Sequence, residues 1–193
     1  KLPPNLTSME EKPESMRGRA AALIVSLIGL VAAAYLVKVH VQIAAGGTVL
    51  CDVNEVLSCS SAASSSFAKL LGVPISLLGL AWYLSALWLI ARKATGLLAI
   101  GYVIGAVYSL FLLIVSLTVL STLCPACAVL YLCNAIGAVG AVAWARSTAG
   151  FKSLSAMPSL SAGGAAVALS VAVISLGMML MPRPAAAPTV TLL

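Results

Sequence analysis

Five long apolar segments decide what this chain can fold into: residues 20–37, 73–91, 97–120, 125–145 and 160–181. Crossing the hydrocarbon core of a bilayer, about 30 Å thick, takes roughly 20 residues of helix. Within lipid a segment must satisfy its own backbone hydrogen bonds, and a helix does so. The sequence therefore predicts an all-α, polytopic membrane protein with five transmembrane helices.

The composition agrees with a bilayer as the solvent. Of 193 residues, 62% are hydrophobic and 8% are charged, whereas a soluble domain carries about 25% charged residues. We expect one membrane domain at residues 20–181, with a polar outer loop at 39–72. The proline-containing segment 1–19 is predicted to be a disordered tail. The segment 182–193 is predicted to be an extended spacer that could precede a thioredoxin-like domain.

The positions of Lys and Arg predict how the helices are oriented, because these residues collect on the cytoplasmic side. With the N-terminus inside, the inner face receives Lys12, Arg17, Arg19, Arg92, Lys93, Arg146 and Lys152, and the outer face receives Lys38, Lys69 and Arg183. Four cysteines then lie outside, where disulfides persist. This topology accounts for the net charge of +6, so lipid is an expected partner and nucleic acid is not.

The sequence Cys124-Pro125-Ala126-Cys127 is the sharpest chemical signal. Proline is favoured at the first position of a helix, which would make Cys124 the N-cap and place Cys127 one turn away. The helix dipole would stabilise a thiolate there. Two cysteines at this spacing could also be half of a metal site, but no nearby histidine completes a zinc pattern, and we expect no metal. The motif therefore predicts a redox-active pair.

Cys51 and Cys59 form a second pair in the outer loop. A purely structural disulfide between them would contribute about 2–3 kcal/mol. The second pair on the same face favours exchange instead, because an attacking thiolate needs a disulfide within contact. Cys133, inside the predicted fourth span, is expected to pack as a small hydrophobic residue.

Two further patterns leave alternatives open. Phe67, Leu70 and Leu71 fall at helical spacing, which predicts a short half-helix that could cover the site as a lid, or else a simple apolar connector. Gly101 and Gly105 form a GxxxG motif, which could mediate dimerisation or close packing inside one bundle.

Several of these residues together resemble the vitamin K epoxide reductase family, over roughly residues 20–146. They are Cys51-Asp52-Val53, Ser58-Cys59-Ser60, Ser65, the helix start at 74–79, Cys124-Pro125-Ala126-Cys127 and Tyr131. The separated cysteine pair precedes the CxxC motif, as in that family, whereas the membrane thiol oxidase DsbB has the reverse order. A fifth helix resembles the bacterial members.

The resemblance implies a four-helix bundle around a quinone, with the fifth helix alongside. It implies that Cys127 faces the quinone, that Cys124 is its disulfide partner, that Cys59 exchanges with Cys124 and that Cys51 faces the protein partner. Ser65 and Tyr131 match polar positions near the quinone, and we expect Phe67 to contact it as well.

We therefore expect a disulfide-generating oxidase of the bacterial cytoplasmic membrane, which takes electrons from a thioredoxin-like or DsbA-like protein and passes them to ubiquinone or menaquinone. A vitamin K epoxide or quinone reductase is the alternative within this class, although Ile75 stands where animal enzymes have an asparagine. A metal-binding or transport protein is the alternative of another class. Transport would be favoured by ionisable residues midway along the helices, where modest polar residues such as Asn134 are found.

Overall fold

The computed structural model describes residues 13–54, 56–148, 150–151 and 157–181. Its elements are α1 (Pro13–Ala44), α2 (Cys59–Ser64), the 3₁₀ turn η1 (Ser66–Ala68), β1 (Lys69–Leu70), β2 (Val73–Pro74), α3 (Ile75–Ala91), α4 (Thr95–Thr118), α5 (Pro125–Ser147) and α6 (Met157–Leu180). Among the described residues, α1, α4, α5 and α6 are long and apolar enough to cross a membrane, and α3 is a shorter apolar helix. The prediction of an all-α polytopic membrane protein is confirmed.

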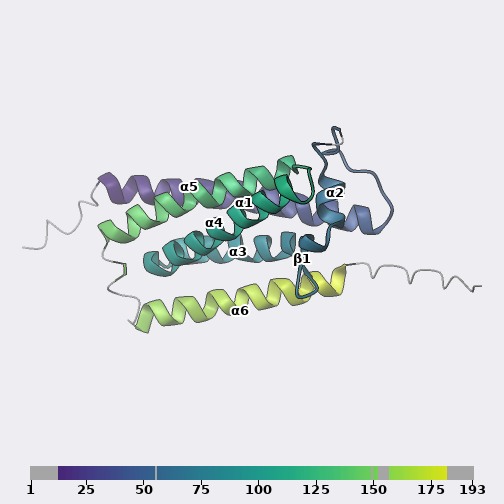
Figure 1. Ribbon diagram of the computed structural model, residues 1–193. Coiled ribbons are helices and arrows are strands. Elements are labelled where there is room, and N and C mark those ends of the chain that lie inside the picture. The colour runs from purple at the N-terminus through teal and green to yellow at the C-terminus, as the bar shows by residue number, and fades with distance from the viewer. Residues whose placement is uncertain (1–12, 55, 149, 152–156, 182–193) are drawn as a thin grey trace, which may run out of the picture.

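The long helices run alongside one another, and the polar connections between α1 and α3 gather at one end (Figure 1). α1 packs against α3 and α5, and α4 packs against α5. The yellow-green α6 lies along α3, where the Ser85 hydroxyl meets the Ser170 hydroxyl at 2.9 Å and donates to the Ala166 carbonyl at 3.1 Å. Although α3 and α4 are consecutive, their backbones approach each other at few places, and side chains such as Trp82 and Tyr102, in edge contact, fill part of the space between them.

The first helix begins earlier than the sequence predicts. Residues 13–19, expected to be part of a disordered tail, are the first turns of α1. Tertiary packing explains the difference, because a Cβ atom at Gly18 would lie 2.9 Å from both the Gly140 carbonyl oxygen and the Trp144 Cβ. α1 and α5 thus pack closely at this point. Residues 1–12 and 182–193 lie outside the described residues.

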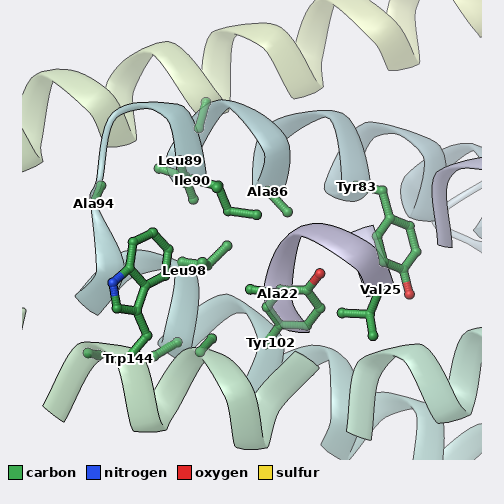
Figure 2. Close-up of a cluster of buried hydrophobic side chains, with 14 of the residues drawn as sticks. Ala22, Val25, Tyr83, Ala86, Leu89, Ile90, Ala94, Leu98, Tyr102 and Trp144 are labelled. Atoms are coloured by element: carbon green, nitrogen blue, oxygen red, sulfur yellow. The ribbon is translucent and has the colours of Figure 1, made fainter. Parts of the chain in front are cut away.

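The main core lies toward the end of the bundle remote from the two cysteine pairs. Trp144 extends toward Ala94 and Leu98 in Figure 2, and the Tyr102 ring lies at Ala22. The Ser26 hydroxyl donates its one hydrogen to the Ala22 carbonyl at 2.6 Å. The Tyr102 hydroxyl, 2.6 Å away, therefore donates to the Ser26 oxygen. This bond ties α1 to α4 and satisfies a buried phenol in an apolar surrounding.

The predicted half-helix at residues 67–71 is wrong. Only the single turn η1 forms, and it is followed by a tight antiparallel hairpin in which Leu70 pairs with Val73. The two turn residues, Leu71 (φ 51°) and Gly72 (φ 83°), have the left-handed conformation that two-residue hairpin turns require. A helix cannot continue through that turn, so the apolar spacing of this segment reflects the hairpin and not a helical face.

The GxxxG motif packs inside the bundle. A Cβ atom at Gly101 would lie 2.1 Å from the Trp82 ring, and one at Gly105 would lie 3.2 Å from Oδ1 of Asn134. The two glycines thus give room to side chains of α3 and α5.

This packing predicts that Gly101→Ala lowers stability by about 1–3 kcal/mol, the usual cost of overpacking. Gly164→Ala is the matched control, because a Cβ atom there meets nothing within 4 Å. Thermal unfolding in detergent should therefore show a lower midpoint for Gly101→Ala alone. Equal midpoints for the two variants would contradict the assignment of the motif to intrabundle packing.

Candidate active site

The loop between α1 and α3 is closed by a disulfide between Cys51 and Cys59, whose Cα atoms are 5.6 Å apart. Cys59 begins α2, and the N-cap Ser58 accepts the N–H of Ser61 at 3.1 Å. Asp52 Oδ1 accepts the Ser60 N–H at 2.9 Å and the Ser58 hydroxyl at 3.0 Å. These bonds, led by the one from the Ser60 backbone, lower the pKa of Asp52. An ionised Asp52 thus fixes the loop around the disulfide.

A backbone bridge ties this loop to the segment that precedes α5. Asn54 Oδ1 accepts the N–H groups of Val56 at 3.0 Å and Leu57 at 2.7 Å. The Val56 carbonyl then accepts the N–H of Leu123 at 2.7 Å, so that Leu57 and Leu123 form an isolated parallel bridge. Each bridge residue is within two positions of a cysteine, so the bridge brings the two cysteine segments together.

Cys124 is the N-cap of α5 and Pro125 is its first residue, as the sequence predicts. The Cys127 N–H donates to the Cys124 sulfur at 3.4 Å. The Cys124 thiol in turn lies 3.1 Å from the Cys59 sulfur, and both cysteines are buried. A thiol and a disulfide in contact are the reactants of thiol–disulfide exchange, whose product here is a Cys59–Cys124 disulfide.

The surroundings of Cys124 favour its thiolate. The pKa of its thiol is lowered chiefly by the hydrogen bond from the Cys127 side chain, and further by the N–H groups of Cys127 and Ala126, while burial and the charge of Asp52 oppose the shift. The N–H groups are those of the first helical turn, so they provide the stabilisation that the helix N-terminus predicts.

We accordingly expect the first thiolate of the reduced Cys124–Cys127 pair to form at a pH below the pKa of an ordinary thiol. At pH 7 the fraction of attacking thiolate is then larger than for an ordinary cysteine. An ultraviolet titration of the fully reduced protein should show this early step, and Cys124→Ala should remove it. A first step at or above the ordinary value would contradict the stabilisation.

A cavity of about 590 Å³ opens beside the cysteines and extends into the bundle between α3 and α4. Of the predicted site residues, Cys51 lies outside its lining, and six line it: Cys59, Ser65, Phe67, Cys124, Cys127 and Tyr131. Cys133 also lies outside the lining and is buried in the main core, which agrees with a packing role.

Sequence reasoning missed much of the inner wall of this cavity. His40, Trp82, Tyr83 and Ser109 also line it, and nothing in their local sequence indicates this. Asn134 is different, because it lies seven residues after Cys127 and therefore on the same face of α5. That spacing was a usable signal.

The cavity fits a quinone by its chemistry as well as its size. Its walls are mainly apolar, and two buried polar atoms on α3, Ser76 Oγ and Trp82 Nε1, have no hydrogen-bond partner among the described residues. Such atoms suit a ligand with a flat ring and a few acceptor oxygens. Cys127 and Tyr131 lie one turn apart on α5 and both line the cavity, so a ring bound there would lie beside both a thiol and a phenol.

A comparison with protein-family models matches residues 20–142 to the vitamin K epoxide reductase family. The match covers more than half of the chain and includes both cysteine pairs and every predicted site residue. No curated protein matched the chain.

Proposed function

The chain belongs to the vitamin K epoxide reductase family, and from this premise we propose that it oxidises a thioredoxin-like protein and reduces a membrane quinone. The family assignment makes the chain an oxidoreductase of a family that generally uses quinones and thioredoxin-like partners. The direction of electron flow, the residue roles and the bacterial inner membrane as its location are parts of the proposal.

The proposed relay has three exchanges that conserve atoms and electrons. The reduced partner transfers two electrons and two protons to the Cys51–Cys59 disulfide and leaves oxidised. The Cys59 thiolate then attacks the Cys124 sulfur of an oxidised Cys124–Cys127 disulfide, and Cys127 is released as a thiolate. Cys51 resolves the Cys59–Cys124 disulfide, which leaves Cys124 and Cys127 reduced.

A quinone bound in the cavity would accept two electrons and two protons from that dithiol and leave as a hydroquinone. Cys127 provides the thiolate at the ring, and Cys124 closes the disulfide with it. We assign Tyr131 and Ser65 to hydrogen bonding with the quinone, and Phe67 to the cover that excludes water from the ring.

One observation supports this proposal above the others, the 3.1 Å contact between the Cys59 and Cys124 sulfurs. A structural loop disulfide has no need of a thiol against its sulfur, whereas a relay requires one. A quinone is favoured over an epoxide as the substrate because Ile75 contributes an apolar side chain to the cavity wall.

The direct test is anaerobic reduction of a short-chain quinone by a small dithiol, catalysed by the purified protein in lipid. We expect quinone-dependent oxidation of the dithiol, with vitamin K epoxide turned over far more slowly. An equal or higher rate with the epoxide would assign the chain to the alternative reaction, and no rate with either would refute the proposal.

The proposed topology places Cys51 and Cys59 outside the cytoplasm. A membrane-impermeant maleimide added to intact, mildly reduced cells should therefore label Cys51, which is partly exposed, whereas Cys59 is buried. Opening the cells should add no label at Cys51. Labelling that requires opened cells would reverse the orientation and with it the oxidase proposal. A Cys51→Ala/Cys59→Ala double variant provides the background signal.

A further inference from the structure

The inner end of the cavity carries a polar cluster for which the relay has no role. Asn134 lies about 10 Å farther along α5 than Cys127, and both residues line the cavity. The Asn134 amide accepts the Tyr83 hydroxyl at 3.1 Å and donates to the Ser109 hydroxyl at 2.8 Å. These bonds fix the amide among α3, α4 and α5, in a part of the bundle where polar groups are costly.

This cluster has unused hydrogen-bond donors. A side-chain amide has two N–H donors, and among the described residues Ser109 is the one acceptor bonded to the Asn134 nitrogen. Trp82 lines the same cavity, and its buried indole N–H has no partner in the described part of the chain. Unused donors in a largely apolar cavity favour a ligand with an acceptor atom at this depth.

The GxxxG glycines create the space for both donors. A Cβ atom at Gly101 would overlap the Trp82 ring, and one at Gly105 would press on the Asn134 amide. Both glycines also line the cavity. The motif therefore shapes this end of the cavity: Gly101 makes room for Trp82, and Gly105, one turn later on α4, makes room for Asn134.

The position of Asn134 relative to Tyr131 indicates what the acceptor is. The two residues are three positions apart, so they are neighbours on the face of α5 that lines the cavity, with a rise of about 4.5 Å between them. A para-quinone carries carbonyl oxygens at opposite ends of one ring, separated by about one helical turn, 5.4 Å. A ring beside Cys127 and Tyr131 would thus direct its second oxygen toward Asn134.

We propose that Asn134 determines specificity at the quinone site by donating its unused amide N–H to the carbonyl oxygen farther from Cys127. The inference rests on the proposed function and adds the residue that recognises the second carbonyl of a para-quinone. As electrons reach the ring, negative charge grows on its oxygens, and a fixed donor stabilises that charge more than it stabilises the neutral carbonyl.

A ligand pair in which one member lacks the second carbonyl, and also the ring double bond, tests this inference through the change that an Asn134 variant makes in their relative affinity. Calorimetry would measure the affinities of para-naphthoquinone and alpha-tetralone for protein whose Cys124–Cys127 pair has been oxidised, so that the ligand is bound and not consumed. We expect the wild type to bind the quinone more tightly than the ketone. Asn134→Leu and Asn134→Ala should each lower this preference by about 3- to 10-fold, the range for one hydrogen bond.

Ser85→Ala is the matched control, because it removes an intramembrane hydrogen bond between α3 and α6 at a residue outside the cavity lining. It should keep the wild-type preference, and thermal unfolding of all variants would show how much stability each has lost. A purely structural role for Asn134 would lower stability but leave the preference unchanged in both Asn134 variants, and that result would overturn the inference. Failure of the wild type to bind any quinone would instead refute the proposed function.

Discussion

Replacing Cys127 by serine is expected to lower quinone reduction by about a thousandfold or more, because the sulfur that faces the ring is lost. The same variant should accumulate a Cys59–Cys124 disulfide. Cys124 already contacts the Cys59 sulfur of the loop disulfide, and its attack would release Cys51 as a thiolate without any added oxidant. No Cys127 thiol remains to displace the new bond, and alkylation of the released Cys51 thiolate blocks the reverse exchange.

Peptide mapping without reductant should therefore find α5 linked to the loop through Cys59 and Cys124, with Cys51 open to alkylation. Cys133→Ala is the control, since it removes the other sulfur of α5 at a residue outside the cavity lining, and it should retain activity. A Cys51–Cys124 link would reverse the roles of the loop cysteines. No link of either kind would count against the relay.

The second large effect is expected in the loop. Cys51→Ser and Cys59→Ser should each reduce activity with a protein thiol donor by about a hundredfold or more, because that donor meets the loop pair first. Activity with a small dithiol should stay within about threefold, since the dithiol can reduce the Cys124–Cys127 pair directly.

Both activities should be measured on the same preparation, together with thermal unfolding, because the loop disulfide itself contributes about 2–3 kcal/mol. The ratio of the two activities does not depend on the amount of folded protein, because both are measured on the same preparation. If the loop variants lose dithiol-driven activity as completely as Cys127→Ser does, the loop pair is not a shuttle.

Local signals in the sequence predicted the elements of the fold well. Apolar length alone indicated α1 and α3 to α6, and Pro125 indicated both the start of α5 and the capping position of Cys124. Such signals depend on neighbouring residues, so they hold without knowledge of the tertiary structure. The same signals failed at residues 67–71, where the turn at Leu71 and Gly72 replaces a helix.

The inner wall of the cavity, apart from Asn134, was beyond this kind of reasoning. The membrane helices are apolar on all sides, so periodicity does not show which face meets a neighbour. Trp82 and Asn134 line one cavity because Gly101 and Gly105 admit both side chains. That relation joins three helices and depends on how they are packed.

The Leu57–Leu123 bridge has a kinetic consequence. It holds two reacting sulfurs on segments 65 residues apart in sequence, so their encounter requires no search by diffusion. Well-oriented groups within one molecule react as if each were present at about 10⁵ M or more. Because exchange between the two cysteine pairs is then fast, we expect a binding event to limit the rate of turnover. The two candidates are arrival of the partner protein from the water and arrival of the quinone from the lipid.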